Sequence, residues 1–245
     1  MATQKFLLFG DSITEFSYDP NQWCLGQALQ NVYSRKLDII QRGFIGYNSR
    51  WCLKILPDIL KELQNIGIAY IFLGSNDSMT EGCTSVPLPE YLANMKAMVE
   101  IMISHDIKVV IVGPAKFDRI TWDRLHPEDI ANGWIRREDT FYEYGYALSE
   151  LCKAEGLPFV DLKTKFEETA GEKWIDLLVD GLHFSGEGYK VFYEELLKII
   201  KIHYPEYHPV NIHYQYPEFF NIKSDMSNLD KWTHSSSNRW KNYHS

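Results

Sequence analysis

The sequence predicts an α/β fold, a three-layer α/β/α sandwich around a parallel sheet of five strands. Five short segments are apolar at almost every position, as in strands buried on both faces of a sheet. Segments with helical spacing of apolar residues separate them, and this alternation is typical of parallel sheets. The chain has 245 residues, no internal repeat and no interior linker, so we expect one main domain.

The predicted strands share a local pattern, in which a run of large apolar residues is closed by a glycine or a polar residue. They cover Phe6–Phe9, Leu37–Ile40, Ile68–Leu73, Lys108–Val112 and Phe159–Leu162. Ligands of open α/β sheets bind at the carboxyl ends of the strands. The polar residues that follow these runs are therefore candidates for a functional site.

The predicted helices follow from apolar residues three and four positions apart. They cover Trp23–Lys36, Arg50–Leu63, a long helix after Pro89, Glu138–Glu155, Thr164–Val179 and Gly186–His203. Ser49 and Ser185 are candidate amino-terminal caps. Pro57 is expected to break or kink its helix, and Gly171 marks a second break. The segment Ala115–Arg136 is irregular and is expected to form part of a rim or lid.

Charge and composition exclude several classes of protein. The net charge is -8, whereas binding to nucleic acid needs a concentrated basic face. The sequence shows no signal segment and no apolar stretch of the ~18 residues that a membrane span requires. The four cysteines are scattered and fit neither a zinc nor a redox motif. We therefore expect a cytoplasmic protein with reduced thiols and without a cofactor.

Ser12 lies directly after the first strand, in Gly10-Asp11-Ser12-Ile13-Thr14. A serine alone is a weak nucleophile, and it needs a base and an oxyanion site. His183 is the candidate base, because Asp180 precedes it by three positions in a loop that enters the last helix. The Asp180 carboxylate can meet one imidazole nitrogen and leave the other for Ser12, which gives a Ser-His-Asp triad.

An acyl-transfer site also needs donors for the developing oxyanion. The candidates are the backbone N–H of Ser12, the backbone N–H of Gly46 and the side-chain amide of Asn76. Each follows a different predicted strand at its carboxyl end, so the three can converge. The other histidines have no carboxylate in the same relation and are interpreted as surface or tail residues: His105, His126, His203, His208, His213, His234 and His244.

Taken together, these motifs resemble the four blocks of the SGNH, or GDSL-type, hydrolases. The blocks are Gly10-Asp11-Ser12, Gly46, Gly74-Ser75-Asn76-Asp77 and Asp180-x-x-His183. The resemblance implies a flavodoxin-like sandwich and the activity of an esterase, lipase, thioesterase or deacetylase. It assigns Ser12 as nucleophile, Asp180 and His183 as the rest of the triad, and Ser12, Gly46 and Asn76 as the oxyanion hole.

Further segments resemble the isoamyl acetate-hydrolysing esterase branch of these hydrolases. They include Gln41–Trp51, Lys54–Pro57, Ser85–Pro89, Asp180–Tyr189 and Tyr204–Pro209. The resemblance implies an enzyme that degrades short-chain esters, acetate esters in particular, and forms a homodimer; we expect it to need no metal or cofactor. The alternatives are a broader lipase or thioesterase, and a non-catalytic SGNH binding module.

Rival interpretations of the same motifs are weaker. Asp11, Asp77, Asp180 and His183 could suggest a metal phosphoesterase, but such a site needs several carboxylates that converge on one metal. A flavodoxin-like nucleotide binder would need a glycine-rich phosphate loop, which Gly10–Thr14 does not provide. The candidates for shaping the substrate pocket are Trp51, Met79 and the segment Phe117–Trp134.

The carboxyl-terminal part of the chain differs in composition from the rest. We expect a hydrolase domain over residues 1–203 and an extension over 204–245, which is rich in Tyr, Trp, His, Asn and Ser. The extension either wraps the surface or stays disordered, or it docks on a partner subunit through its aromatic residues. The sequence leaves both possibilities open.

Overall fold

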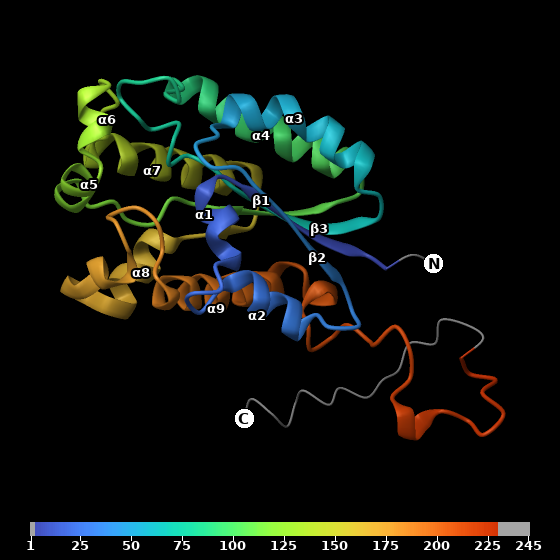
Figure 1. Ribbon diagram of the computed structural model, residues 1–245. Coiled ribbons are helices and arrows are strands. Elements are labelled where there is room, and N and C mark those ends of the chain that lie inside the picture. Colours follow the sequence, from blue (N-terminus) through green and yellow to red (C-terminus); the bar gives the residue numbers. More distant parts are fainter. Residues whose placement is uncertain (1–2, 230–245) are drawn as a thin grey trace.

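The computed structural model describes residues 3–229. A single parallel sheet of five strands runs through its centre, in the order β2-β1-β3-β4-β5, with helices on both faces (Figure 1). The strands are β1 (Lys5–Gly10), β2 (Asp38–Gly43), β3 (Ile66–Phe72), β4 (Lys108–Val112) and β5 (Phe159–Val160). The predicted fold class, a three-layer α/β/α sandwich, is confirmed.

The helices of the structure follow the predicted alternation. They are α1 (Ser12–Glu15), α2 (Leu25–Val32), α3 (Ser49–Glu62), α4 (Leu88–Ser104), α5 (Arg119–Leu125), α6 (Pro127–Ala131), α7 (Glu138–Glu155), α8 (Leu162–Ala170) and α9 (Gly186–His203). Short 3₁₀ helices cover Phe16–Tyr18, Gly171–Leu177, Pro205–Tyr207 and Phe219–Asn221. The predicted break at Gly171 is confirmed, because α8 ends there and a 3₁₀ helix begins.

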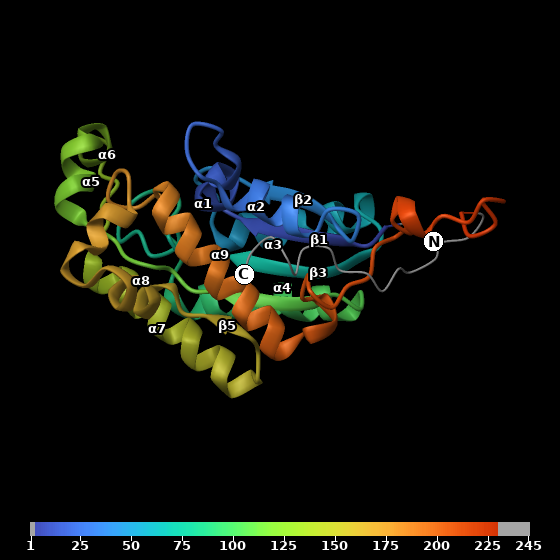
Figure 2. The same cartoon turned by 90° about the horizontal axis from the view of Figure 1, so that it is seen from below.

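The two faces of the sheet pack against different helices because strand side chains alternate in direction. On β1, Phe6 and Leu8 join the core shared with α2, α8 and α9. Leu7 and Phe9 point the other way, into the core shared with α3, α4 and α7. Figure 2 shows the same layers from below, with α2 and α9 lying across the sheet. Burial on both faces explains why the strands are continuously apolar.

Three local predictions are corrected. Asn48, not Ser49, caps α3, since its side chain accepts a hydrogen bond from the Trp51 N–H at 3.0 Å. Pro57 does not break α3 and lies on its exposed side, where water can satisfy the carbonyl that loses its donor; the alternative, a kink at Pro57, stays a prediction. The segment 115–136 is not irregular throughout, because it contains α5 and α6. The Ser185 cap on α9 is confirmed by its bond to the Gly188 N–H.

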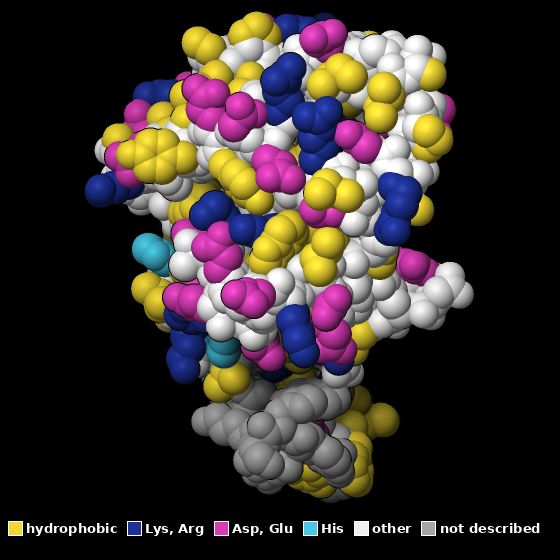
Figure 3. Space-filling view, turned by 90° about the vertical axis from the view of Figure 1, so that its left-hand side faces the viewer, with side chains coloured by type: hydrophobic (Ala, Val, Ile, Leu, Met, Phe, Trp, Pro, Cys, Tyr) yellow, Lys and Arg dark blue, Asp and Glu magenta, His cyan; other side chains and the backbone are white. Residues whose placement is uncertain are grey.

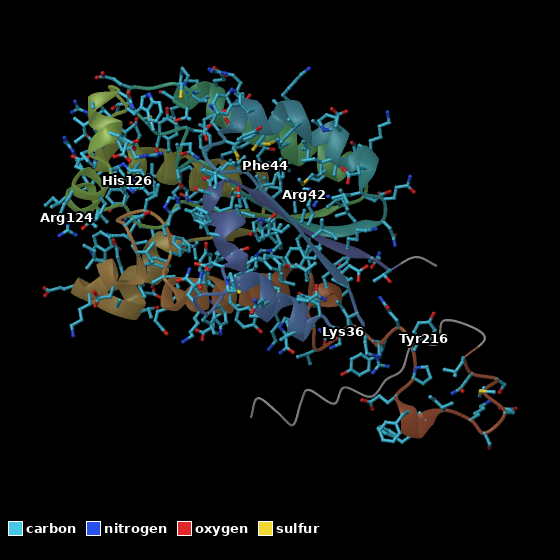
Figure 4. The ribbon with its side chains drawn as sticks, in the orientation of Figure 1. Lys36, Arg42, Phe44, Arg124, His126 and Tyr216 are labelled. Carbon is cyan, nitrogen blue, oxygen red and sulfur yellow. The ribbon has the colours of Figure 1, made fainter. Side chains whose placement is uncertain are left out.

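Residues 204–217 contact the main domain beside α2. Tyr33 Oη donates to the Tyr207 carbonyl at 2.9 Å, and Lys36 Nζ donates to the Pro209 carbonyl at 2.5 Å. Arg35 donates to the Tyr216 carbonyl at 2.8 Å; Figure 4 labels Lys36 and Tyr216 where the extension leaves the body. The division of the chain at residue 203 stays a prediction, and residues 230–245 of the extension lie outside the described residues.

The carboxyl ends of the strands lie at one end of the molecule, together with α5 and α6 (Figure 1). Seen from that end, acidic and basic side chains are interspersed over the surface rather than gathered by sign (Figure 3). None of the helices in residues 3–229 combines the length and the apolar character needed to cross a membrane.

Candidate active site

Ser12 sits at the sharp turn where β1 passes into α1. Asp11 caps α1 by accepting a hydrogen bond from the Ile13 N–H at 3.0 Å, and Ser12 is the first residue of the helix. The turn is so tight that a Cβ at Gly10 would meet Thr14 Oγ1 at 2.3 Å and the Phe72 carbonyl oxygen at 2.6 Å. Only glycine fits such an approach. The turn therefore holds the Ser12 hydroxyl at the carboxyl edge of the sheet.

His183 and Asp180 come from the loop between the 3₁₀ helix Gly171–Leu177 and α9, and they meet Ser12 in space. Ser12 Oγ lies 2.8 Å from His183 Nε2, and His183 Nδ1 lies 2.6 Å from Asp180 Oδ2. Since a carboxylate only accepts, Nδ1 carries the proton and Nε2 accepts from Ser12. The structure thus brings together the three side chains that the sequence predicts for a triad.

Backbone N–H groups of the same loop hold the second carboxylate oxygen of Asp180 in place. Asp180 Oδ1 accepts hydrogen bonds from the Leu182 N–H at 3.0 Å and from the His183 N–H at 2.8 Å. Burial alone would raise the pKa of Asp180, but the hydrogen bonds and the charge of His183, with these two amides, outweigh it and lower the pKa to about 2. Asp180 is therefore ionised at neutral pH and orients the imidazole.

Two aromatic rings enclose the imidazole of His183. Phe16 packs edge-on with ring centroids 5.0 Å apart, and Trp122 of α5 lies at 5.9 Å. The His126 ring stacks on the Trp122 ring, with the two ring centroids 4.0 Å apart. Its Nε2 is 3.7 Å from Asp180 Oδ2, which is too long for a hydrogen bond.

The interpretation of His126 as a surface residue is therefore corrected, because the histidine is only partly exposed and lies beside Asp180, although no carboxylate precedes it in the way that Asp180 precedes His183. The segment between α5 and α6 folds back over the triad and places His126 beside Asp180, at the corner labelled in Figure 4. These positions lie far apart along the chain, and no local spacing in the sequence relates them. Sequence reasoning did single out Phe117–Trp134 as a pocket-shaping segment, which contains both Trp122 and His126.

The predicted oxyanion donors lie on neighbouring loops that are tied to one another. The Phe44 N–H donates to the Gly10 carbonyl at 3.0 Å, and Asn76 Nδ2 donates to the Tyr47 carbonyl at 2.8 Å. Gly46 lies between these two links and has a φ of +75°, a conformation that glycine adopts without strain. A Cβ at Gly46 would meet no atom within 4 Å, so the loop presents open backbone there.

Asn76 is held from the opposite side by Arg136, a residue that sequence reasoning missed. An Arg136 Nη2 donates to Asn76 Oδ1 at 2.9 Å, and Nη1 donates to the Ser75 carbonyl. Burial lowers the pKa of Arg136 to about 10, so the guanidinium is still charged at neutral pH. No sequence signal near Trp134-Ile135-Arg136-Arg137 distinguishes this arginine from a surface residue.

Asp11 and Asp77 are two further acidic side chains near Ser12, and both are fully buried. One oxygen of each carboxylate accepts a hydrogen bond from a backbone N–H. Asp11 accepts from Ile13, and Asp77 accepts from Ser49 at 2.8 Å. The other oxygen of each has no hydrogen-bond partner within residues 3–229. Burial, with the charge of Asp77 added, raises the pKa of Asp11 to about 7, and burial raises that of Asp77 to about 6.

Two further predicted residues lie near the oxyanion loops. Trp51 packs edge-on against Tyr47 at 5.6 Å, and Met79 is buried, with its sulfur 3.5 Å from Thr84 Oγ1. Their role in shaping a pocket stays a prediction. Nowhere in the described part of the chain do three or more His, Cys, Asp or Glu side chains gather as a candidate metal site.

Comparison with known proteins decides the family. Residues 8–191 match the GDSL-like Lipase/Acylhydrolase family. The chain belongs to this family. The predicted enzyme class, a carboxylic ester hydrolase of the SGNH/GDSL type, is thereby confirmed.

Individual relatives agree with the assignment. The chain is 49% identical to the isoamyl acetate-hydrolyzing esterase of Saccharomyces cerevisiae over 236 residues, which cover 94% of this chain and 99% of the yeast protein. It is 33% identical to the human isoamyl acetate-hydrolyzing esterase 1 homolog, over 80% of this chain and 81% of the human one. A lipase/acylhydrolase from Enterococcus faecalis shares the fold, with a TM-score of 0.63, 23% identity, and coverage of 81% of this chain and 96% of the bacterial one.

Proposed function

We propose that this GDSL-family esterase hydrolyses short-chain carboxylic esters, acetate esters such as isoamyl acetate in particular. The observation that carries the proposal is the continuous chain of hydrogen bonds from Ser12 Oγ to His183 Nε2 and from His183 Nδ1 to Asp180 Oδ2. The choice of acetate esters is supported by the 49% identity to the yeast enzyme over nearly the whole length of both chains.

The proposed reaction proceeds through an acyl-enzyme. His183 Nε2 takes the proton of the Ser12 hydroxyl as the oxygen attacks the ester carbonyl, and the tetrahedral oxyanion accepts hydrogen bonds from the N–H groups of Ser12 and Gly46 and from Asn76 Nδ2. His183 then gives the proton to the leaving alcohol oxygen, and the bond from this oxygen to the acyl carbon breaks.

Water completes the cycle. His183 takes a proton from the water molecule as its oxygen attacks the acyl carbon, and the proton then returns to Ser12 as the acid is released. Asp180 stabilises the imidazolium in both halves of the reaction. Its depressed pKa, about 2, keeps it ionised over the whole neutral range, as this task requires.

Initial rates on p-nitrophenyl esters of increasing acyl length test the proposal, with isoamyl acetate as a second substrate. We expect fast turnover of acetate, a steep fall beyond butyrate and complete loss in Ser12→Ala. Ser17→Ala is the matched control, because Ser17 is also a buried serine near this turn but lies outside the proposed machinery. Maximal rates on long acyl chains would show a lipase or thioesterase, and no Ser12-dependent turnover would indicate a binding module.

Assembly and location are further proposals. We infer a homodimer in the cytoplasm. The dimer is supported by apolar side chains at residues 219–229 that are exposed in the single chain, with Phe219 75% and Phe220 58% exposed. The cytoplasm is supported by four free cysteines. Analytical ultracentrifugation of the wild type should show a dimer, and the double variant Phe219→Asp with Phe220→Asp should sediment as a monomer. A monomeric wild type would contradict the proposed dimer.

A further inference from the structure

Arg136 is a buried cation without an acidic partner in contact. It is 8% exposed, and within residues 3–229 no carboxylate lies within salt-bridge distance of it. Its hydrogen-bond acceptors are the Ser75 carbonyl and Asn76 Oδ1, while its Nε has none. Burial of a charge with so few partners is strongly unfavourable, so this placement needs a reason beyond packing.

The surroundings hold Arg136 rigidly. Ile135, its neighbour, forms an antiparallel bridge with Glu81, and its carbonyl accepts from the Thr80 N–H at 2.8 Å. The guanidinium lies 5.1 Å from the ring of Trp122. Trp122 is in turn fixed by its Nε1, which donates to Asp129 Oδ2 at 3.1 Å. The Arg136 side chain is therefore held between the loop that follows Asn76 and the helices α5 and α6.

The contact determines which way the Asn76 amide faces. A guanidinium carries donors only, so it must meet the oxygen of the amide and not the nitrogen. The nitrogen then points away from Arg136, and one of its hydrogens goes to the Tyr47 carbonyl. The second hydrogen is left for an oxyanion. Without Arg136, the amide could turn its oxygen toward the place where negative charge develops.

We propose that Arg136 is a positioning residue for the reaction, which fixes the orientation of the Asn76 amide in the oxyanion hole. The inference rests on the proposed function and adds a residue to it. Arg136 does not touch the substrate in this account. It acts through Asn76, and its two bonds to adjacent residues, Ser75 and Asn76, need the planar fork of arginine.

Steady-state kinetics on p-nitrophenyl acetate test the coupling. We expect Arg136→Met to lower kcat about 10²-fold, as does removal of one oxyanion donor, with KM changed less than about threefold because ground-state binding is not involved. Arg136→Lys keeps the charge but lacks the fork, and we expect about a tenfold loss of kcat. Arg137→Met is the matched control, since Arg137 is the adjacent exposed arginine, and it should behave as wild type.

The deciding comparison is made in the background of Asn76→Ala. Once the amide is gone, Arg136→Met should lower kcat by less than about threefold, because residues that act through one another are not additive. Losses that multiply in the double variant would overturn the proposal. If Arg136→Met fails to fold, the same comparison is made with Arg136→Lys, and a wild-type kcat in that variant would also overturn it.

A readout without turnover separates this inference from the proposed function. The side-chain amide signals of Asn76, assigned by their loss in Asn76→Ala, should shift in the ¹⁵N NMR spectrum of Arg136→Lys. Unchanged signals would refute the positioning role even in an active enzyme. Shifted signals in a protein that hydrolyses no ester would support the contact and refute the proposed function.

Discussion

Three carboxylates lie near Ser12 in two groups, Asp180 in one and Asp11 with Asp77 in the other, and their environments shift the pKa values of the two groups in opposite directions. Asp180 has hydrogen-bond donors for both oxygens, and its pKa falls to about 2. Asp11 and Asp77 each have an oxygen without a partner in the described structure, and their pKa values rise to about 7 and about 6. The same type of side chain is thus ionised throughout the neutral range in one place and titrates between about pH 6 and pH 7 in the other.

The difference shows that the number of hydrogen-bond donors around a carboxylate determines the direction of its pKa shift more than burial does. Asp180 is itself partly buried, with a side chain 17% exposed, yet it stays charged because a loop supplies two backbone N–H groups and an imidazole. Asp11 is stabilised by the backbone N–H of Ile13, and Asp77 by the backbone N–H and the side chain of Ser49, but these donors do not offset the loss of water. We therefore assign catalysis to the first group and support of the turn to the second.

The largest expected effect is that of Asp180→Asn. An amide at this position cannot stabilise the imidazolium and favours the wrong tautomer of His183, so we expect kcat to fall about 10⁴-fold. Asp11→Asn should lower kcat less than about tenfold, because asparagine caps a helix as well as aspartate. Stopped-flow or steady-state rates on p-nitrophenyl acetate measure both. Equal losses in the two variants would remove the distinction between the groups.

The next effect concerns stability and pH. The pKa of Asp11 in the folded protein lies above its usual value of 3.8, so the folded state binds more protons than the unfolded state between about pH 4 and pH 7. Stability from this group is present below pH 4 and is lost as the pH rises through about 7. We expect Asp11→Asn to flatten this part of the profile and to raise the free energy of unfolding at pH 8 by about 1–3 kcal/mol.

Urea denaturation of wild type and Asp11→Asn at a series of pH values checks this prediction. Asp180 gives the opposite sign, since a lowered pKa contributes stability above pH 3.8 that is lost as the pH falls toward about 2. Asp180→Asn should therefore destabilise the protein at pH 7 and leave the slope between pH 4 and pH 7 unchanged. We expect the free energy of unfolding of Asp11→Asn, minus that of wild type, to be larger at pH 8 than at pH 5. A smaller difference at pH 8 would contradict the account.

The smallest expected effect is that of His126→Gln. His126 Nε2 is 3.7 Å from Asp180 Oδ2, beyond hydrogen-bond distance, and Asp180 already has three donors. We expect kcat to change less than about fivefold, because a pair at this distance contributes little. The same assay measures it, with Asp180→Asn beside it. A loss near that of Asp180→Asn would mean that α5 and α6 form part of the machinery rather than its cover.

The sequence predicts the sheet and the triad because their signals are local. Strands buried on both faces are continuously apolar, and Asp180 lies three residues from His183, so their contact follows from a single loop. The fold then does the rest, because parallel strands such as β1 and β3 deliver Ser12 and Asn76 to one edge. The family motifs name the remaining residues of the oxyanion hole.

What sequence reasoning missed depends on contacts between distant segments. Arg136 and His126 reach the site only because the chain between β4 and α7 folds over it, and nothing in their neighbours along the chain indicates this. The partnerless oxygens of Asp11 and Asp77 also depend on burial that no spacing reveals. The wrong prediction of Ser49 as the cap of α3, where Asn48 is the cap, has a simpler reason. The two residues are adjacent, and both residue types cap helices well.

Trapping of the acyl-enzyme tests the central claim most directly. Wild type and Asp180→Asn are mixed with p-nitrophenyl acetate, quenched in acid within milliseconds to seconds, and digested for peptide mass spectrometry. We predict an acetyl group on the Ser12 hydroxyl in both proteins and none in Ser12→Ala. Ester turnover without an adduct on Ser12 at any quench time, or with the acetyl group on another residue, would contradict the assignment of Ser12 as nucleophile.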